Sequence, residues 1–318
     1  MKKSIGPDKV KTAVFISGTG SNLKNLIKFS FKKNSPISIN LIISNKSNAK
    51  GLKYANQQKI EKKIINFISP KESEKKIINL LEKKKISFIC LAGFMKILSN
   101  NFLKRFNGKV INIHPSLLPL YRGPSPISAV ILDGAKQTGV TIMLLNQGMD
   151  TGPILIQSDP VLLFGNETTS ELSKDLFLKG SELLVDILDK YYQGKINLIE
   201  QDNNFATYTN LIKATEGEIN WQKSADYIFK RYRAFDKWPG IFTFWKRKRI
   251  KLIQLEIFNN NFQKIKPGKI TLYDKNLLIG TGSCPLRIIS LQLEGKKISK
   301  SLDFVKGYKE ILNETLPS

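Results

Sequence analysis

The only histidine of this 318-residue chain, His114, stands where a side chain could take part in proton transfer. The alternating apolar run at 110–113 predicts a strand, and prolines 115 and 119 stop regular structure soon after it. An imidazole at a strand end titrates near neutral pH and is the usual general acid or base of enzymes. A lone histidine is also commonly a structural residue, so this segment alone leaves both interpretations open.

Two further polar residues extend His114 to a candidate catalytic set. Asn112 lies two residues before it, and Asp150 follows a later apolar strand candidate in a Met-Asp-Thr-Gly segment. A carboxylate near an imidazole raises its pKa and orients it, while an amide can donate to a developing oxyanion. Because no serine or cysteine nucleophile with a glycine elbow accompanies the set, it favours direct transfer through a tetrahedral intermediate over a covalent acyl-enzyme.

The elements that must position these residues belong to a chain long enough for two globular domains. Hydrophobic residues make up 41% of it and charged residues 24%, which suits an ordinary buried core. Lysine and arginine number 51 against 26 acidic residues, giving a net charge of +25. That excess suggests a polyanionic partner, nucleic acid first and phosphorylated metabolites second. A lysine-biased proteome explains the same excess, and both explanations stay open.

The cysteines and the apolar runs limit the class of protein. Cys90 and Cys284 with one histidine exclude an ordinary zinc cluster and a disulfide scaffold, so we expect no metal and a reducing compartment. No apolar run reaches the roughly 20 residues that span a bilayer. No signal-peptide core follows the basic start of the chain. We therefore expect a soluble cytoplasmic protein that does not bind membranes.

Alternating strand and helix patterns in the first half predict an α/β fold. The buried run at 12–17 passes through a glycine turn at 18–22 into a helix, which is the opening of a nucleotide-type α/β unit. A helix is expected at 72–84, and further strands at 37–43, 64–67 and 88–91. We predict a mainly parallel, Rossmann-like sheet with helices on both faces, whose strand ends carry the glycine turn and His114.

The second half changes character after a long helix. This helix should begin near Thr168, which has capping-box spacing to Glu171, and end near Gly194. The Asn-rich stretch 196–209 reads as a linker. Beyond it, short β-like runs between turn residues indicate a small OB-like β-barrel. The predicted domains are 1–195 and 210–318, joined by 196–209.

The glycine turn is an ambiguous motif. It lacks the third glycine of a dinucleotide fingerprint, since Leu23 stands there, and it lacks the acidic residue about 20 positions on, so NAD binding is disfavoured. Backbone N–H groups of Gly20, Ser21 and Asn22 could still hold a single phosphate of a substrate. A tight strand-to-helix turn with no ligand fits the same residues.

Four segments together resemble the 10-formyltetrahydrofolate-dependent formyltransferases. They are L-A-G-F-M-K-I-L at 91–98, N-I-H-P-S-L-L-P at 112–119, G-V-T-I-M at 139–143 and M-D-T-G at 149–152. The resemblance covers essentially the whole chain, and the second block is long enough to be highly specific. It changes the interpretation of His114 from a structural residue to a catalytic one.

This resemblance implies roles for named residues. Asn112, His114 and Asp150 would be catalytic, with Asn112 and protonated His114 stabilising the oxyanion and Asp150 directing protons through His114 or water. The formyl group would pass from 10-formyltetrahydrofolate to an amine. The folate pocket would be lined by Met95, Lys96, Ile97, Leu98, Ser116, Leu117, Leu118 and Pro119.

The two halves resemble different branches of the family. Up to about Arg122 the chain is similar to glycinamide ribonucleotide formyltransferases, in I-S-G-T-G-S-N-L and A-G-F-M-K-I-L-S. After Gly123 it resembles methionyl-tRNA formyltransferases, most clearly in R-A-F-D-K-W-P-G at 233–240 and in its β-rich tail. Two features depart from these patterns: the basic loop that the tRNA enzymes insert after their second strand is absent, and Pro124-Ser125-Pro126 replaces a histidine-bearing segment of the ribonucleotide enzymes.

The second domain decides between the two acceptors. A small metabolite needs no second domain, whereas a tRNA acceptor stem needs phosphate contacts over a broad surface. We therefore predict formylation of initiator methionyl-tRNA by a monomer, with glycinamide ribonucleotide as the alternative acceptor. A sugar-nucleotide amine would be a further alternative acceptor. An inactive RNA-binding protein that kept the fold would be an alternative from a different class of function. Basic runs are often only solvated, but here they are candidate tRNA contacts: Lys246, Arg247, Lys248, Arg249, Lys296 and Lys297.

Overall fold

The computed structural model describes residues 9–33, 35–258, 265–312 and 314–318, which form two compact units. The first unit comprises Met1–Pro126, Gln137–Leu162 and Ser173–Thr209. The second comprises Ile127–Lys136, Leu163–Leu172 and Asn210–Ser318. Within the described ranges, no helix has the length and apolar character needed to cross a membrane.

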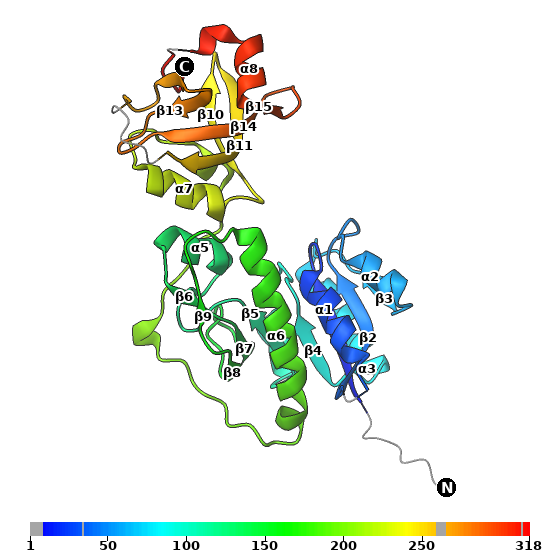
Figure 1. The fold of residues 1–318 in the computed structure, drawn as a ribbon. Coiled ribbons are helices and arrows are strands. Elements are labelled where there is room, and N and C mark those ends of the chain that lie inside the picture. The colour runs from blue at the N-terminus through cyan, green and yellow to red at the C-terminus, as the bar shows by residue number, and fades with distance from the viewer. Residues whose placement is uncertain (1–8, 34, 259–264, 313) are drawn as a thin grey trace. The chain divides into compact units, whose positions relative to one another are not determined.

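A seven-stranded sheet is the centre of the first unit (Figure 1). Its order is β3-β2-β1-β4-β5-β7-β8, and the first five of these strands are parallel while β7 and β8 are antiparallel. The predicted Rossmann-like sheet is thus confirmed. The strands are β1 Val10–Ile16, β2 Ile37–Ser44, β3 Lys62–Ile64, β4 Phe88–Leu91, β5 Val110–His114, β7 Thr141–Leu144 and β8 Ile154–Gln157. A separate small ladder joins β6 Gln137–Thr138 to β9 Val161–Leu162.

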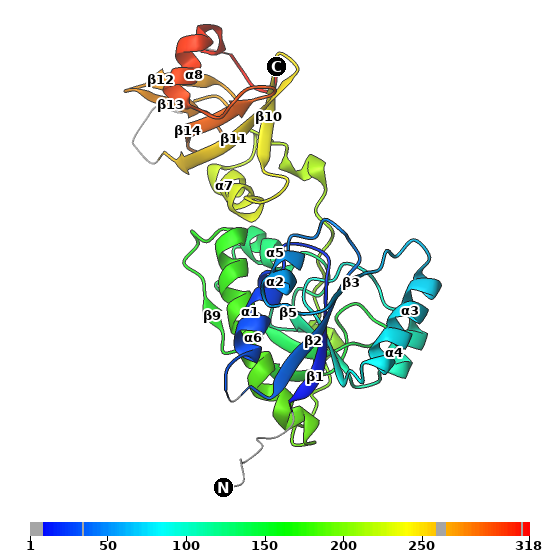
Figure 2. The ribbon, with the colours of Figure 1, turned by 90° about the vertical axis from the view of Figure 1, so that its right-hand side faces the viewer.

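Helices cover both faces of this sheet, as Figure 2 shows for α1 and α6 on one side and α3 and α4 on the other. Alternate residues of the buried strands point to opposite faces, so each strand contributes to two cores. Phe15 and Leu41 pack with Ile77 of α3 and Phe102 of α4. The helices of this unit are α1 Ser21–Ser30, α2 Leu52–Gln57, α3 Pro70–Lys83, α4 Asn100–Arg105 and most of α6 Thr169–Tyr192, whereas α5 Pro126–Asp133 belongs, apart from Pro126, to the second unit.

Two predicted boundaries can be compared with the structure. Thr168 and Glu171 form the expected capping box, with the Thr168 N–H 2.9 Å from Glu171 Oε2 and the Glu171 N–H 3.3 Å from Thr168 Oγ1. The strand expected at 64–67 was placed too late, because β3 pairs only with β2 and its last partner there is Ser44, the end of that strand.

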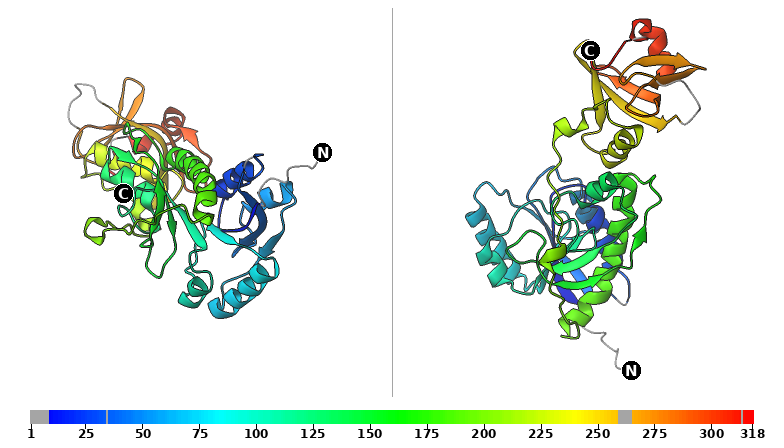
Figure 3. Two further views of the ribbon diagram at one scale, coloured as in Figure 1. Left: turned by 90° about the horizontal axis from the view of Figure 1, so that it is seen from below. Right: turned by 90° about the vertical axis from the view of Figure 1, so that its left-hand side faces the viewer.

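The second unit contains a six-stranded antiparallel sheet, yellow to orange-red in Figure 3. Its path is β10-β11-β14-β13-β12, with β15 pairing β14, and it confirms the expected OB-like β-rich module. The strands are β10 Ile241–Trp245, β11 Lys248–Ile257, β12 Ile270–Tyr273, β13 Asn276–Ile279, β14 Leu286–Leu293 and β15 Ser299–Lys300, and the helices are α7 Ala225–Ala234 and α8 Ser301–Gly307. Short 3-10 turns lie at Ala214–Gly217 and Lys309–Ile311 in this unit and at Asn203–Phe205 in the first unit.

The stretch expected to be a linker has little regular structure but is closely held within the first unit. Ile199 bridges Ile154 of β8, and the Thr209 N–H donates to the Arg122 carbonyl at 2.7 Å. This stretch is therefore part of the fold of the first unit.

The glycine turn has a packing role that can be tested. Gly20 has φ +74°, and a Cβ there would lie 2.4 Å from Gly51 Cα, whereas a Cβ on Gly18 would meet nothing within 4 Å. Gly20→Ala should lower stability by about 2 kcal/mol or more, because it adds a backbone clash to left-handed strain. Gly18→Ala is the matched control and should change little. Equal unfolding midpoints for the two variants would contradict this close approach.

Candidate active site

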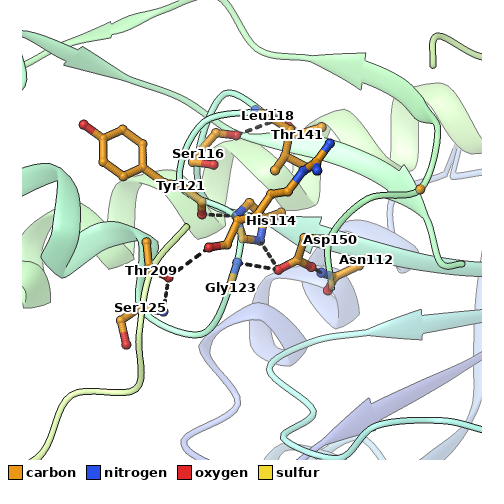
Figure 4. Close-up of polar contacts among 12 residues, drawn as sticks. Asn112, His114, Ser116, Leu118, Tyr121, Gly123, Ser125, Thr141, Asp150 and Thr209 are labelled. Carbon is orange, nitrogen blue, oxygen red and sulfur yellow. Dashed lines mark hydrogen bonds and ion pairs between the residues drawn. The ribbon is translucent and has the colours of Figure 1, made fainter. Parts of the chain in front are cut away.

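The three predicted catalytic residues come together at the carboxyl end of β5 (Figure 4). Asn112 and His114 lie on β5, and Asp150 lies in the connection between β7 and β8. Asn112 Nδ2 donates to Asp150 Oδ1 at 3.4 Å, and His114 Nδ1 is 3.5 Å from Asp150 Oδ2. Strand β7 is the neighbour of β5 in the sheet, and the connection that follows β7 brings Asp150 next to Asn112, 38 positions earlier in the chain. Their catalytic role stays a prediction.

The hydrogen bonds of His114 define its tautomer. Its Nε2 lies 2.9 Å from the carbonyl oxygen of Tyr121. A carbonyl can only accept, so Nε2 must carry a proton. In the neutral imidazole Nδ1 is then unprotonated and faces Asp150, and a proton added to Nδ1 would lie between the imidazole and the carboxylate.

Burial controls the charge of His114, which is only 3% exposed. Loss of solvation lowers the pKa of the imidazole, and this outweighs the Asp150 charge and the Tyr121 carbonyl, both of which raise that pKa. The resting imidazole is therefore neutral at neutral pH. The protonated His114 that the resemblance implies would therefore form only during the reaction, when the imidazole takes up a proton.

Asp150 is held in an unusual backbone conformation. Its φ is +54°, a left-handed value that costs a non-glycine residue roughly 1–2 kcal/mol. The Gly123 N–H donates to its Oδ2 at 2.9 Å. Its side chain is 17% exposed, whereas that of His114 is 4% exposed. The carboxylate is thus the part of the pair that lies nearer to solvent.

Backbone groups of the Tyr-Arg-Gly turn hold both members of the pair. Tyr121 supplies the carbonyl to His114, and Gly123 supplies the N–H to Asp150. Both residues have positive φ, +59° and +109°. At Gly123 a Cβ would lie 2.6 Å from the Thr209 carbonyl oxygen, so only glycine fits there without a shift. Sequence reasoning missed these contacts, although a glycine after an aromatic and a basic residue was a usable signal.

The predicted folate segments follow two neighbouring strands. Residues 95–98 come after β4 and residues 116–119 after β5, so both leave the same edge of the sheet. Thr141 Oγ1 fixes the second segment, donating to the Ser116 carbonyl at 2.7 Å and accepting from the Leu118 N–H at 3.1 Å. Within the two segments the structure buries Leu98, Ser116 and Leu118, half-buries Leu117 and Pro119, and exposes Met95, Lys96 and Ile97. Folate binding by these residues stays a prediction.

The glycine turn lies at the N-terminus of α1. Gly20 is the N-cap and supplies no side-chain cap, Ser21 is exposed, and Asn22 is buried with no hydrogen-bond partner for Oδ1. The Gly51 N–H donates to the Gly18 carbonyl at 3.0 Å, which explains the tight turn. Phosphate binding here stays a prediction.

The basic tail residues gather at one end of the second sheet. Lys246 and Arg247 occupy the β10–β11 turn with positive φ, and Lys248 and Arg249 begin β11. Backbone bonds tie this hairpin to the turn after β14, since the Glu294 N–H donates to the Arg249 carbonyl at 2.8 Å. That turn carries Lys296 and Lys297, and all six side chains are exposed.

The part of the chain that the structure describes contains no set of side chains suited to binding a metal ion. No three His, Cys, Asp or Glu side chains cluster there in a way that could hold an ion. Cys90 and Cys284 are not joined in a disulfide, and burial raises the pKa of Cys90 to about 12.

Comparison with known proteins adds two family matches. The sequence model described as formyl transferase matches residues 10–188, and the one described as formyl transferase, C-terminal domain, matches residues 211–309. A relative from Thermodesulfovibrio yellowstonii, named methionyl-tRNA formyltransferase, is 37% identical over 231 residues, which is 73% of each chain.

Solved structures resemble the chain in two ways. A phosphoribosylglycinamide formyltransferase from Anaplasma phagocytophilum is 28% identical with a TM-score of 0.55, and the match covers all of that chain but 64% of this one. A HypX structure from Aquifex aeolicus covers 96% of this chain and 50% of its own, with a TM-score of 0.67. At 15% identity that second match shows the fold alone.

Proposed function

The chain belongs to the formyl transferase family, and from this premise we propose that it transfers a formyl group from 10-formyltetrahydrofolate to the amino group of methionyl-tRNA. One observation carries the choice of acceptor. The relative named for that reaction aligns over 73% of both chains. The phosphoribosylglycinamide formyltransferase aligns over its whole length, but it covers only 64% of this chain. Residues 211–309 match a separate C-terminal model, which supports an acceptor larger than a nucleotide.

The proposed reaction is a displacement at the formyl carbon. The substrate amine attacks this carbon, a new C–N bond forms, and the carbonyl oxygen becomes an oxyanion. The intermediate collapses when the bond to the folate nitrogen breaks. One proton leaves the attacking amine and one is taken up by the leaving nitrogen, so a single residue pair can move both.

The site residues suit these two tasks. Asn112 Nδ2 has two N–H groups and uses one toward Asp150, so the other can donate to the oxyanion. Asp150 lies nearer to solvent and receives the amine proton, which it shares with the unprotonated Nδ1 of His114. The pair returns this proton to the folate nitrogen.

Formylation of glycinamide ribonucleotide is the second candidate. The uncapped N-terminus of α1 at Gly20 supports it, since such N–H groups suit a phosphate. A phosphoribosylglycinamide formyltransferase also matches this chain at 28% identity.

We further propose that the protein acts as a monomer in the cytoplasm. Its functional domains would be residues 1–195 and 210–318, joined through 196–209. The two family matches end and begin near these limits. The basic end of the second sheet would contact the tRNA backbone.

A formylation assay tests the proposal. With 10-formyltetrahydrofolate as donor, the protein should formylate charged initiator methionyl-tRNA and should leave glycinamide ribonucleotide unmodified. Transfer to the ribonucleotide alone would overturn the choice of acceptor, and no transfer to either would overturn the reaction itself.

The same assay tests the catalytic residues. His114→Ala and Asp150→Asn should each lower turnover at least ~100-fold, because proton transfer is lost, while folate still binds. Asp159→Asn, an exposed residue outside the site, is the matched control and should keep wild-type turnover. Turnover near wild type in either site variant would remove that residue from the mechanism.

Salt dependence tests the basic end of the second sheet. A variant with glutamine at Lys246, Arg247 and Lys248 should bind tRNA at least ~10-fold more weakly and show a flatter salt dependence, because phosphate contacts are lost. Glutamine at Lys71, Lys75 and Lys76, exposed on α3, removes the same charge elsewhere and serves as the control. If both variants keep the wild-type salt slope, the basic tail is only solvated.

A further inference from the structure

We propose that Arg122 and Gln201 are positioning residues for the formyl transfer, and that they act by holding the turn that carries Asp150. This inference rests on the proposed function. It gives the segment around Gln201, which reads as a linker in the sequence, a part in building the active site.

Gln201 holds the backbone on both sides of the Asp150 peptide. Its Nε2 donates to the carbonyl of Asp150 at 2.9 Å and to the carbonyl of Gly152 at 2.7 Å. Both N–H groups of one amide are thus used on one turn. Because Asp150 has a strained φ of +54°, such bonds counteract relaxation of the turn.

Arg122 fixes the orientation of that amide. Its Nε and Nη2 donate to Gln201 Oε1 at 3.0 and 2.8 Å. A guanidinium can only donate, so the oxygen of Gln201 must face it and the nitrogen must face the Asp150 turn. The remaining donor contacts run from Nη1 to Asn203 Oδ1 at 2.9 Å and to the Tyr208 hydroxyl at 3.2 Å.

The burial of Arg122 supports a role in orienting Gln201. The residue is 0% exposed, and none of its described hydrogen-bond partners is a carboxylate. Burying a charge among neutral groups costs free energy, and an apolar side chain of similar size could fill the space at lower cost. An apolar side chain could not orient Gln201.

The backbone of Arg122 closes the network around the catalytic pair. Its N–H donates to the Thr207 carbonyl at 2.9 Å, and its carbonyl accepts from Thr209. Its two neighbours are Tyr121, bonded to His114, and Gly123, bonded to Asp150. The backbone of this tripeptide therefore fixes the imidazole of His114 and the carboxylate of Asp150. The Arg122 side chain, acting through Gln201, fixes the turn that carries Asp150.

Two substitutions of Gln201 separate geometry from stability. Gln201→Met keeps the length and removes all the polar contacts. Gln201→Glu keeps an oxygen toward Arg122, with which it can form an ion pair, but presents oxygen instead of N–H to the two carbonyls. Gln193→Met is the control, because it changes an exposed glutamine just after α6 whose side-chain amide donates to Asp189.

We expect both Gln201 variants to lower kcat roughly 10- to 100-fold and to change the KM for the folate less than ~3-fold, because the reacting groups are misplaced and the folate segments are not. Gln201→Glu should keep the thermal midpoint of the wild type. The control should match the wild type in kcat, KM and midpoint. Wild-type kcat in either Gln201 variant would overturn the inference.

A second readout does not depend on activity, because the chain has one imidazole. Asp150 from the β7–β8 turn is the charged side chain that contacts it, while its contact from the Tyr-Arg-Gly turn is a backbone carbonyl. In Gln201→Met the carboxylate should move away, so the His114 nitrogen resonances should shift and the imidazole pKa should fall further. Unchanged resonances would overturn the inference even if kcat fell. If the wild-type protein were inactive, only the proposed function would be rejected. The His114 resonances of Gln201→Met would still test whether Gln201 positions Asp150.

Discussion

The hydrogen bond from His114 to the Tyr121 carbonyl is the contact on which the rest of the site depends. Because the carbonyl can only accept, it places the proton of the neutral imidazole on Nε2 and leaves Nδ1 open toward Asp150. Burial then keeps the imidazole neutral by lowering its pKa. The result is a pair that can take up one proton and give it back, which is what formyl transfer between two nitrogens requires.

Building this pair costs free energy, and interactions elsewhere in the first unit offset that cost. Tyr121 and Asp150 both have left-handed φ angles, and Arg122 is a fully buried cation. Each feature costs of the order of 1–3 kcal/mol or more and persists only where its surroundings hold it. Those surroundings are the buried strands β4, β5 and β7 on one side and the returning segment at 199–209 on the other. Strain at this point is compatible with a site whose geometry matters more than its stability.

Much of this arrangement could be predicted from local patterns. The alternating run before His114 and the N-I-H-P-S-L-L-P block pointed to β5 and to the catalytic set, and helix and strand periodicity predicted the mainly parallel sheet. Gln201 could not be found in this way, since its partners lie 79 and about 50 residues away and it sits in a polar stretch without periodicity. Such a stretch looks like a linker because its backbone is satisfied by side chains and isolated bridges instead of a ladder. Local patterns do not predict the start of strand β10, because its five residues follow a proline and a glycine that are typical of a turn.

The arrangement at His114 is tested most directly by a nitrogen-15 spectrum of the untagged wild-type protein, in which the one histidine gives one imidazole. At neutral pH the imidazole should be the tautomer with the proton on Nε2, and its pKa should lie below the usual value of about 6.5. Lowering the pH should protonate Nδ1 only below that value. A proton on Nδ1 at neutral pH, or a pKa above the usual value, would contradict it.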